Sequence, residues 1–407
     1  MWYIKILYKL GVDMKKNIFI LIVLLIIIIS IFFGCSSELR HTIEQWEKIE
    51  EQKIRETQEG VQYRGKILDI ISDETQELEG GLESRLQILE VEITNGAFKN
   101  EIIEVKNCIE PNSPYNITVN KGDGIFIITE VDEDLNINNA YVTGLIRDKY
   151  IIFLTVAFII ILILVGRLKG LKAAITLALT GVAVVKIMLP LILRGYNPIL
   201  VSAVISVGII IVTLIIIGGF NRKTLSTIIG TSIGILIAGI FALVFGNISK
   251  LTGLGNEEAR MLIFIPQEIS FDFRGLLFSG IILASLGAVM DVSMSISSSM
   301  FEIIKIDPTI KKSDLMSAGM SVGRDIIGTM SNTLILVYVG CSLPLMLLFM
   351  AYDISFVEII NKDMIASEVV RALAGSIGLI LTIPITVLIS ASLLNKKNVR
   401  PTRHRKL

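Results

Sequence analysis

At residues 279–302 the chain reads SGIILASLGAVMDVSMSISSSMFE, an apolar stretch that carries a single acid, Asp291, followed by a run of serines. An α-helix crosses the hydrocarbon core of a bilayer with about twenty apolar residues, so this stretch predicts a transmembrane helix. A charged side chain at the centre of such a helix costs about 2.5–3.5 kcal/mol on insertion scales. We therefore expect Asp291 to pair with a cation, to face a polar cavity or to take part in function.

The composition of the whole chain points the same way. Of its 407 residues 52% are hydrophobic and 19% are charged, and the mean hydropathy is +0.70. These values predict a membrane protein with several spans and exclude an ordinary soluble globular protein. Basic and acidic residues balance at 38 each, and the chain has only three cysteines and two histidines. We expect no metal site, no cofactor, no disulfide framework and no nucleic-acid partner.

The N-terminal segment has the form of an export signal. A basic start at residues 14–16, MKK, precedes an apolar run at 18–33, which predicts a short cytoplasmic start and a signal anchor helix within residues 1–35. The Gly34-Cys35 pair that follows also resembles a lipoprotein cleavage box. Phe32 and Phe33 stand where such boxes usually carry Leu and a small residue, which favours an uncleaved anchor over cleavage and lipidation at Cys35.

Residues 36–148 are predicted to form an exported β-rich domain. Runs rich in Val, Ile and Tyr, separated by Gly, Asn, Asp and Pro, predict short strands. These runs are 61–71, 86–93, 101–109, 124–131 and 140–146. Their number and spacing favour a small all-β, OB-like barrel. No basic stripe interleaved with aromatic residues accompanies them, so docking of a protein partner is favoured over nucleic-acid binding.

Residues 149–395 are predicted to form a seven-helix transmembrane domain, which makes about eight spans with the anchor. The apolar blocks are 151–165, 173–193, 198–217, 225–245, 275–297, 328–352 and 371–394. Four groups of Lys and Arg, within 167–172, 222–223, 305–312 and 396–406, fall on one side of such a bundle. The positive-inside rule makes that side cytoplasmic. We therefore expect a cytoplasmic membrane protein with both termini inside, residues 36–148 outside and a basic cytoplasmic tail at 396–407.

The acid of the opening stretch belongs to a regular pattern of small and polar residues. At spacings of three and four, these residues share one face of a helix: Gly280, Ala284, Gly287, Asp291, Ser295 and Ser298. Small residues let helix backbones approach closely, and serines bond across such contacts, so packing is the favoured role of the glycines and most serines. Packing alone rarely needs a carboxylate, which leaves Asp291 as the candidate for function.

A second polar motif, SAGMSVGRDIIGTMSNTL at residues 317–334, follows shortly after. Residues 315–351 exceed one bilayer crossing, and the glycines would permit a bend, so we expect 315–330 to be interfacial or re-entrant. Shared depth and opposite charge suggest that Arg324 pairs with Asp291. The predicted site comprises Asp291, Ser295, Ser298, Arg324, Asp325, Thr329 and Asn332. Lys186 is another charge within a span, where snorkelling is slightly favoured over a cavity-facing role.

These motifs resemble those of the YibE/F-like family of bacterial integral membrane proteins. The resemblance rests on LGAVMDVSMSISSSMFEI at residues 286–303 and SAGMSVGRDIIGTMSNTLILVYVG at 317–340. It extends over most of the chain beyond the anchor. It implies a membrane protein and leaves the activity open.

Three functions compete at this point. The first is a transporter or permease in which the predicted site lines a polar path and Asp291 carries protons. The second is an envelope scaffold or accessory subunit, whose exported domain docks an envelope protein and whose polar face packs helices of a partner or of a homo-oligomer in the lipid bilayer. The third, an intramembrane aspartyl protease using Asp291 and Asp325, is disfavoured by the adjacent Arg324. No Walker loop, HExxH or nucleophile elbow is present, so we expect no enzymatic activity.

Overall fold

The computed structural model describes residues 61–78, 82–110, 113, 116–131, 137–264 and 271–393. The chain divides after Val156 into two compact units. The predicted signal anchor at 1–35 and the predicted tail at 396–407 lie outside the described residues.

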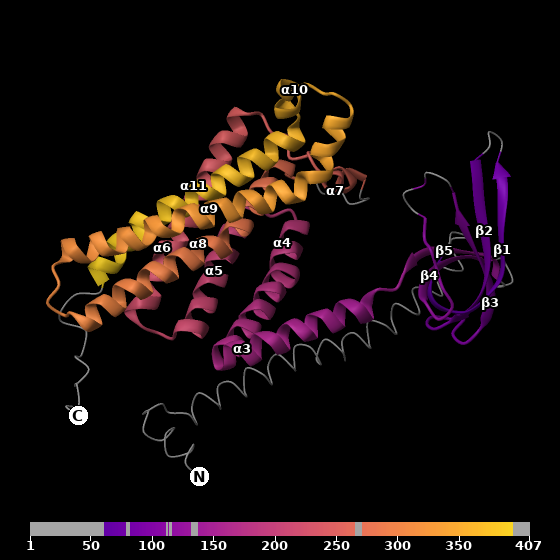
Figure 1. The fold of residues 1–407 in the computed structure, drawn as a ribbon, viewed down its shortest axis with the longest axis horizontal. Helices are drawn as coiled ribbons and strands as arrows, with labels where there is room; N and C mark the ends of the chain where they lie inside the picture. Colours follow the sequence, from indigo (N-terminus) through magenta and orange to yellow (C-terminus); the bar gives the residue numbers. More distant parts are fainter. Residues whose placement is uncertain are drawn as a thin grey trace, which may run out of the picture. The chain divides into compact units, whose positions relative to one another are not determined.

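The first unit contains the predicted barrel (Figure 1). Its strands are β1 (Val61–Leu78), β2 (Leu82–Ile93), β3 (Ile102–Ile109), β4 (Gly124–Val131) and β5 (Ile137–Leu145). They close in the order β1-β2-β3-β5-β4, with β3 and β5 parallel and the other neighbours antiparallel. The all-β prediction is confirmed. The first two strands are longer than predicted because they continue pairing as a hairpin as far as Leu78 and Leu82.

Alternation of apolar and polar residues builds the barrel core. Tyr63 and Ile67 on β1, and Leu89 and Val91 on β2, are all buried while their neighbours in sequence are more exposed. The ring of Tyr63 meets that of Phe98 edge to face, with 5.7 Å between centroids. The barrel therefore has its own hydrophobic core.

A polar network crosses β1, β2 and β3. Asn107 donates to the side-chain oxygen of Gln87 at 2.9 Å, and both residues are buried. Gln87 in turn donates to Asp73, which also forms an ion pair with Arg85. The hydrogen bond from Arg85, followed by that from Gln87, lowers the pKa of Asp73 from 3.8 to about 2. The network thus satisfies two polar groups inside the sheet.

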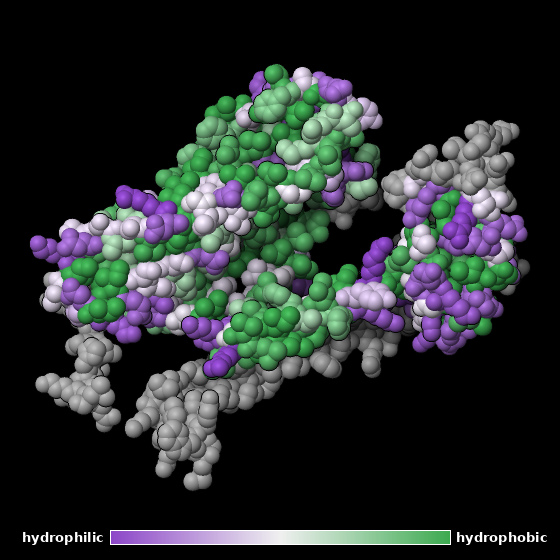
Figure 2. Space-filling model, viewed as in Figure 1, coloured by the Kyte–Doolittle hydropathy of each residue, from purple (hydrophilic) through white to green (hydrophobic). Residues whose placement is uncertain are grey.

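The second unit is helical, and its first helix begins in the first unit. The helices are α3 (Asp148–Val182), the π-helical η1 (Ala183–Met188), α4 (Leu189–Leu193), α5 (Pro198–Gly218), α6 (Arg222–Ile248), α7 (Glu257–Met261), the 3-10 turn η2 (Leu262–Phe264), α8 (Phe273–Ile306), α9 (Lys312–Ala351), α10 (Phe356–Asn361) and α11 (Asp363–Leu393). Figure 2 shows hydrophobic residues over most of the visible surface of this unit, with hydrophilic residues gathered toward its ends. This is the distribution expected of a bundle that crosses a membrane.

Six helical stretches of the described residues are long and apolar enough to cross a membrane. The predicted total of about eight is therefore not confirmed. The predicted anchor lies outside the described residues, and the blocks predicted at 151–165 and 173–193 belong to one 46-residue stretch, Asp148–Leu193. That stretch is broken at Arg167, whose φ of 49° and ψ of −129° are not helical. Just after the break, a Cβ at Gly170 would lie 2.8 Å from the carbonyl carbon of Leu162, so only glycine fits there.

Small residues bring α6, α8 and α11 together at the centre of the bundle. A Cβ at Gly234 of α6 would press against Thr382 of α11 and lie 2.9 Å from Val289 of α8. A Cβ at Gly378 of α11 would lie 3.0 Å from the carbonyl oxygen of Gly234. Such close backbone approach is the way membrane helices gain dispersion contacts without a hydrophobic driving force. The core around these contacts includes Val289, Leu379 and Ile383.

The long helix α9 is continuous, where the sequence suggested a bent, interfacial or re-entrant piece at 315–330. Its 40 residues run from Lys312 to Ala351, which at 1.5 Å per residue is about 60 Å. The glycines serve packing: a Cβ at Gly319 would lie 2.7 Å from the sulfur of Met300, and Gly323 meets Ile296 and Ile383. In Figure 1, α9 and α11 run side by side, in agreement with their many contacts.

Candidate functional site

The predicted small and polar face of α8 is an open face in the structure. Gly280, Ala284, Gly287, Asp291 and Ser295 are exposed and Ser298 is half-buried; we call these six residues the open face of α8. A Cβ built at Gly280 or Gly287 meets no atom within 4 Å. These two glycines therefore do not pack against another helix within the described chain, although packing was the role favoured from sequence.

The serines that pack lie on the opposite side of α8. Ser297 is buried, bonds to Ser226 of α6, lies 3.2 Å from the hydroxyl of Ser390 of α11, and donates to the carbonyl oxygen of Lys223 at 3.1 Å. Ser293 is also buried and accepts from Thr386 at 3.2 Å. Two serines that the sequence did not single out thus join three helices, whereas Ser295 and Ser298 belong to the open face.

Asp291 lies at the middle of α8. At 1.5 Å per residue it is about 27 Å from Phe273 and about 23 Å from Ile306. Its side chain forms no hydrogen bond or ion pair with any described residue. The suggested ion pair with Arg324 is not formed. In the part of the chain that the structure describes, the carboxylate is therefore without a compensating partner.

Helical periodicity separates two of the predicted site residues, Arg324 and Thr329, around the axis of α9. Arg324 precedes Ile335 by about three helical turns, so both side chains lie on the same side of α9. Ile335 lines a cavity against α11. Arg324 therefore lies toward the α11 side of the helix. At 3.6 residues per turn, Thr329 lies about 140° further around the axis of α9 than Arg324.

The predicted site residues of α9 are exposed along that helix. These residues are Arg324, Asp325, Thr329 and Asn332. The Thr329 hydroxyl donates to the carbonyl oxygen of Ile326 at 3.0 Å, so it bonds to its own helix. The structure thus brings Asp291, Ser295 and Ser298 together on α8, while the α9 residues form a separate polar surface. Lys186 is exposed within the π-helical turn η1, a helix type found frequently at functional sites.

A charged pair near the start of α11 was missed by the sequence analysis. Arg371 donates to Glu368 at 2.8 Å, and their side chains are only 21% and 18% exposed. The last span was predicted to begin at residue 371, with Glu368 in the preceding loop, whereas α11 begins at Asp363. The signal that could have found the pair is its spacing of three residues just before an apolar run.

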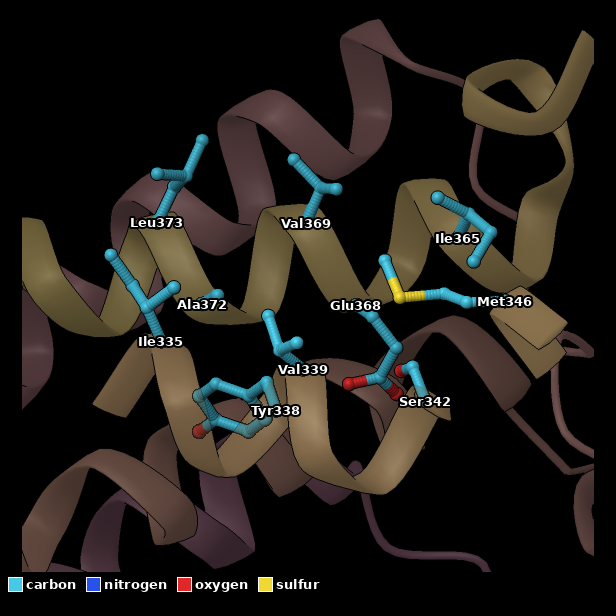
Figure 3. Close-up of a pocket in the computed structure, with 10 residues that line it drawn as sticks. All are labelled: Ile335, Tyr338, Val339, Ser342, Met346, Ile365, Glu368, Val369, Ala372 and Leu373. Carbon is cyan, nitrogen blue, oxygen red and sulfur yellow. The ribbon is translucent and has the colours of Figure 1, made fainter. Parts of the chain in front are cut away.

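Two atoms of this pair have no hydrogen-bond partner among the described residues. They are Oε2 of Glu368 and Nε of Arg371, and both are buried. Glu368 faces a cavity of about 190 Å³ between α9 and α11. Figure 3 shows its carboxyl group beside Ser342, with Tyr338 and apolar side chains completing the wall. Buried polar atoms nearly always have a hydrogen-bond partner in proteins, so these two unpaired atoms call for an explanation.

No metal site arises from the residues that the structure describes. Within the described ranges, no three His, Cys, Asp or Glu side chains come together as ligands.

Comparison with protein families covers most of the chain. The profile of the YibE/F-like protein family matches residues 154–396, which include the helical unit with α8, α9 and α11. The profile of the YibE/F family N-terminal domain matches residues 47–145, which include the barrel. No curated protein and no solved structure matches the chain.

Proposed function

The chain belongs to the YibE/F-like family, and from the site itself we propose that this membrane protein is a permease whose polar path follows the open face of α8. The observation that supports the proposal most strongly is the carboxylate of Asp291 at mid-helix, exposed on a face of small and hydroxylic residues. In this proposal Asp291 binds and releases protons as the coupling ion. Ser295 and Ser298 supply hydroxyls beside it.

The energetics of the face favour water over lipid as its surroundings. Against hydrocarbon, Asp291 would cost about 2.5–3.5 kcal/mol on insertion scales, and no ion pair with a described residue offsets that cost. Glycines on the same face would add little dispersion contact with lipid tails. Ionisable residues in membrane spans usually face a bundle interior or a water-filled cavity, and they mark ion pathways.

The proposed orientation places the cytoplasm at the end of the bundle where α5 and α6 connect. Three chain segments meet at this end: Arg222 donates to the carbonyl oxygen of Leu393, and Lys312 lies 3.3 Å from the hydroxyl of Ser392. Lys223, Lys305 and Lys311 belong to the same connections. By the positive-inside rule this end is cytoplasmic. In the proposed topology the stretch Asp148–Leu193 crosses the membrane twice, once on either side of its break at Arg167. The predicted barrel of residues 36–148 then lies outside the bacterial cytoplasmic membrane and the C-terminus lies inside.

Proton flux tests the permease proposal. We expect the purified protein in proteoliposomes to dissipate a pH gradient reported by an entrapped dye. The Asp291→Asn variant should slow this flux at least tenfold, since its amide cannot carry a proton. The matched control is Glu302→Gln on the same side of α8, near the helix end and paired with Lys305 at 3.4 Å, which should keep the wild-type rate. Flux that is equal in the Asp291→Asn variant and the wild type would overturn the proposal.

A specific observation also supports a second function. At the glycines of the open face a Cβ would meet no atom within 4 Å, and glycine is the residue type that lets a helix of another polypeptide approach closely. In this alternative the protein is an envelope scaffold or accessory subunit, with a partner covering α8 and the barrel docking an envelope protein. A stoichiometric partner that co-purifies with the wild type and is lost on Gly287→Leu, together with no proton flux in either protein, would favour this function.

A further inference from the structure

A cavity of about 500 Å³ lies where the barrel joins α3, within the first compact unit. Its lining comes from the segment 122–124 at the start of β4, from the connection between β5 and α3, and from the first two turns of α3. The polar side chains of the lining include Asp123, Arg147, Lys149 and Tyr150. Apolar side chains complete it, so the cavity offers both kinds of surface to a ligand.

Two basic side chains of this cavity are accessible and unpaired. Arg147 and Lys149 are both exposed, and neither forms an ion pair with a described residue. The acid between them in sequence, Asp148, is already paired with Arg64 at 3.0 Å. Asp123 also lines the cavity, and its carboxylate accepts a hydrogen bond from a backbone N–H of its own turn at 2.8 Å. These two cations and one acid give the lining one positive charge in excess.

Backbone hydrogen bonds build the wall of the cavity into the barrel. The N–H of Ile146 donates to the carbonyl oxygen of Gly124 at 2.8 Å, which ties the start of α3 to β4. Ile67 of β1 donates to the carbonyl oxygen of Asp123 at 3.0 Å and accepts from the N–H of Gly122 at 2.9 Å. A Cβ at Gly124 would lie 3.2 Å from the Cβ of Ile146, so the two walls are in close contact. The cavity is therefore part of the folded barrel.

The apolar part of the lining continues onto the surface of a membrane-spanning stretch. Ile151 and Leu154 line the cavity, and every side chain from Tyr150 to Leu154 is exposed. These residues open the stretch Asp148–Leu193, which is long and apolar enough to cross a membrane. When this stretch spans a bilayer, lipid covers the exposed side chains, and Tyr150 has the amphipathic ring typical of the membrane–water interface. The cavity therefore lies at the depth where phospholipid head groups meet acyl chains.

We propose that this cavity binds a phospholipid whose head group carries one negative charge, with its phosphate between Arg147 and Lys149 and an acyl chain along Ile151 and Leu154. A guanidinium binds phosphate through paired N–H donors, and an ammonium binds it as a point charge. The single positive charge in excess matches an anionic head group, whereas a zwitterionic head group has no net charge to offset it. The site requires that α3 enters the membrane, and it does not depend on proton transport along α8.

Quenching of a tryptophan by brominated lipid tests this site in the full chain. The native Trp2 and Trp46 are replaced by phenylalanine, and Leu154→Trp supplies a reporter at the cavity. The protein is reconstituted into mixtures of phosphatidylglycerol and phosphatidylcholine in which one lipid carries brominated chains. We expect the reporter to prefer phosphatidylglycerol at least tenfold. Arg147→Gln and Lys149→Gln should each lower this preference about fivefold, the effect of one basic residue near a membrane surface.

Two controls show whether the preference belongs to the cavity. Phe153→Trp places the reporter about 100° around α3 from Leu154 and should show little preference between the lipids. Lys121→Gln removes one charge from the barrel at a lysine paired with Asp69 at 3.1 Å, and should leave the preference at Leu154→Trp unchanged. The proposal is overturned if both lipids quench equally, if Lys121→Gln acts as strongly as Lys149→Gln, or if millimolar inorganic phosphate abolishes the preference, which would indicate a site for the free anion. Lipid contact is measured without proton flux, so this proposal and the permease proposal can fail separately.

Discussion

Replacing Gly234 of α6 by alanine tests how the bundle is packed. The added Cβ would press against the hydroxyl of Thr382 and lie 2.9 Å from a methyl group of Val289. Something must move, and overpacking of a tight core costs about 1–3 kcal/mol. The same change at Gly287, on the open face of α8, places the Cβ where no atom lies within 4 Å. Both variants share the propensity gain of alanine over glycine in a helix, about 1 kcal/mol.

The difference between the two variants therefore isolates the overpacking cost. We expect Gly234→Ala to be less stable than Gly287→Ala by about 1–3 kcal/mol, measured from loss of helical circular dichroism as the detergent-solubilised protein is unfolded with urea. Thr382→Ala in the Gly234→Ala background should recover part of the loss, since it removes the hydroxyl that clashes. Equal stability of the two glycine variants would refute this account of the core, and a loss confined to Gly287→Ala would show instead that a partner covers the open face.

Two further predictions concern the open face and the barrel. With the native cysteines replaced, Ser295→Cys should react with a charged, water-soluble maleimide at least ten times faster than Ser297→Cys. The reason is that Ser295 is exposed on the open face, whereas Ser297 is buried among three helices. If lipid covers the face, both variants will be unreactive. In the barrel, the folded-state pKa of Asp73 lies below its ordinary 3.8. The ion pair of Asp73 with Arg85 therefore contributes stability that is fully present above about pH 4 and is lost as pH falls through about 2. A titration of the Asp73 carboxyl carbon by NMR should show a midpoint near pH 2 that rises toward 3.8 in Arg85→Ala, and an unchanged midpoint would contradict the assigned cause.

Local patterns were sufficient to predict most elements of this protein. The strand predicted at 124–131 is β4, and the span predicted at 198–217 is α5, because alternation and length are properties of the segment itself. The face shared by Gly280, Asp291 and Ser295 was also predictable, since a helix places residues three and four apart on one side. A helix boundary was less predictable: α11 begins eight residues before the predicted span, at Asp363, and this brought Glu368 into the helix beside Arg371.

Composition and periodicity alone predict a membrane protein with a small barrel domain, in which one acid shares a helix face with glycines and serines. Three features arise only when the helices pack: this face is open, Ser293 and Ser297 make the helix contacts, and Arg324 forms no ion pair with Asp291. Periodicity predicts which residues share a face of a helix. The direction of that face depends on how glycines such as Gly319, Gly323 and Gly234 fit against neighbouring helices. That fit joins residues far apart in the chain, and no local pattern contains it.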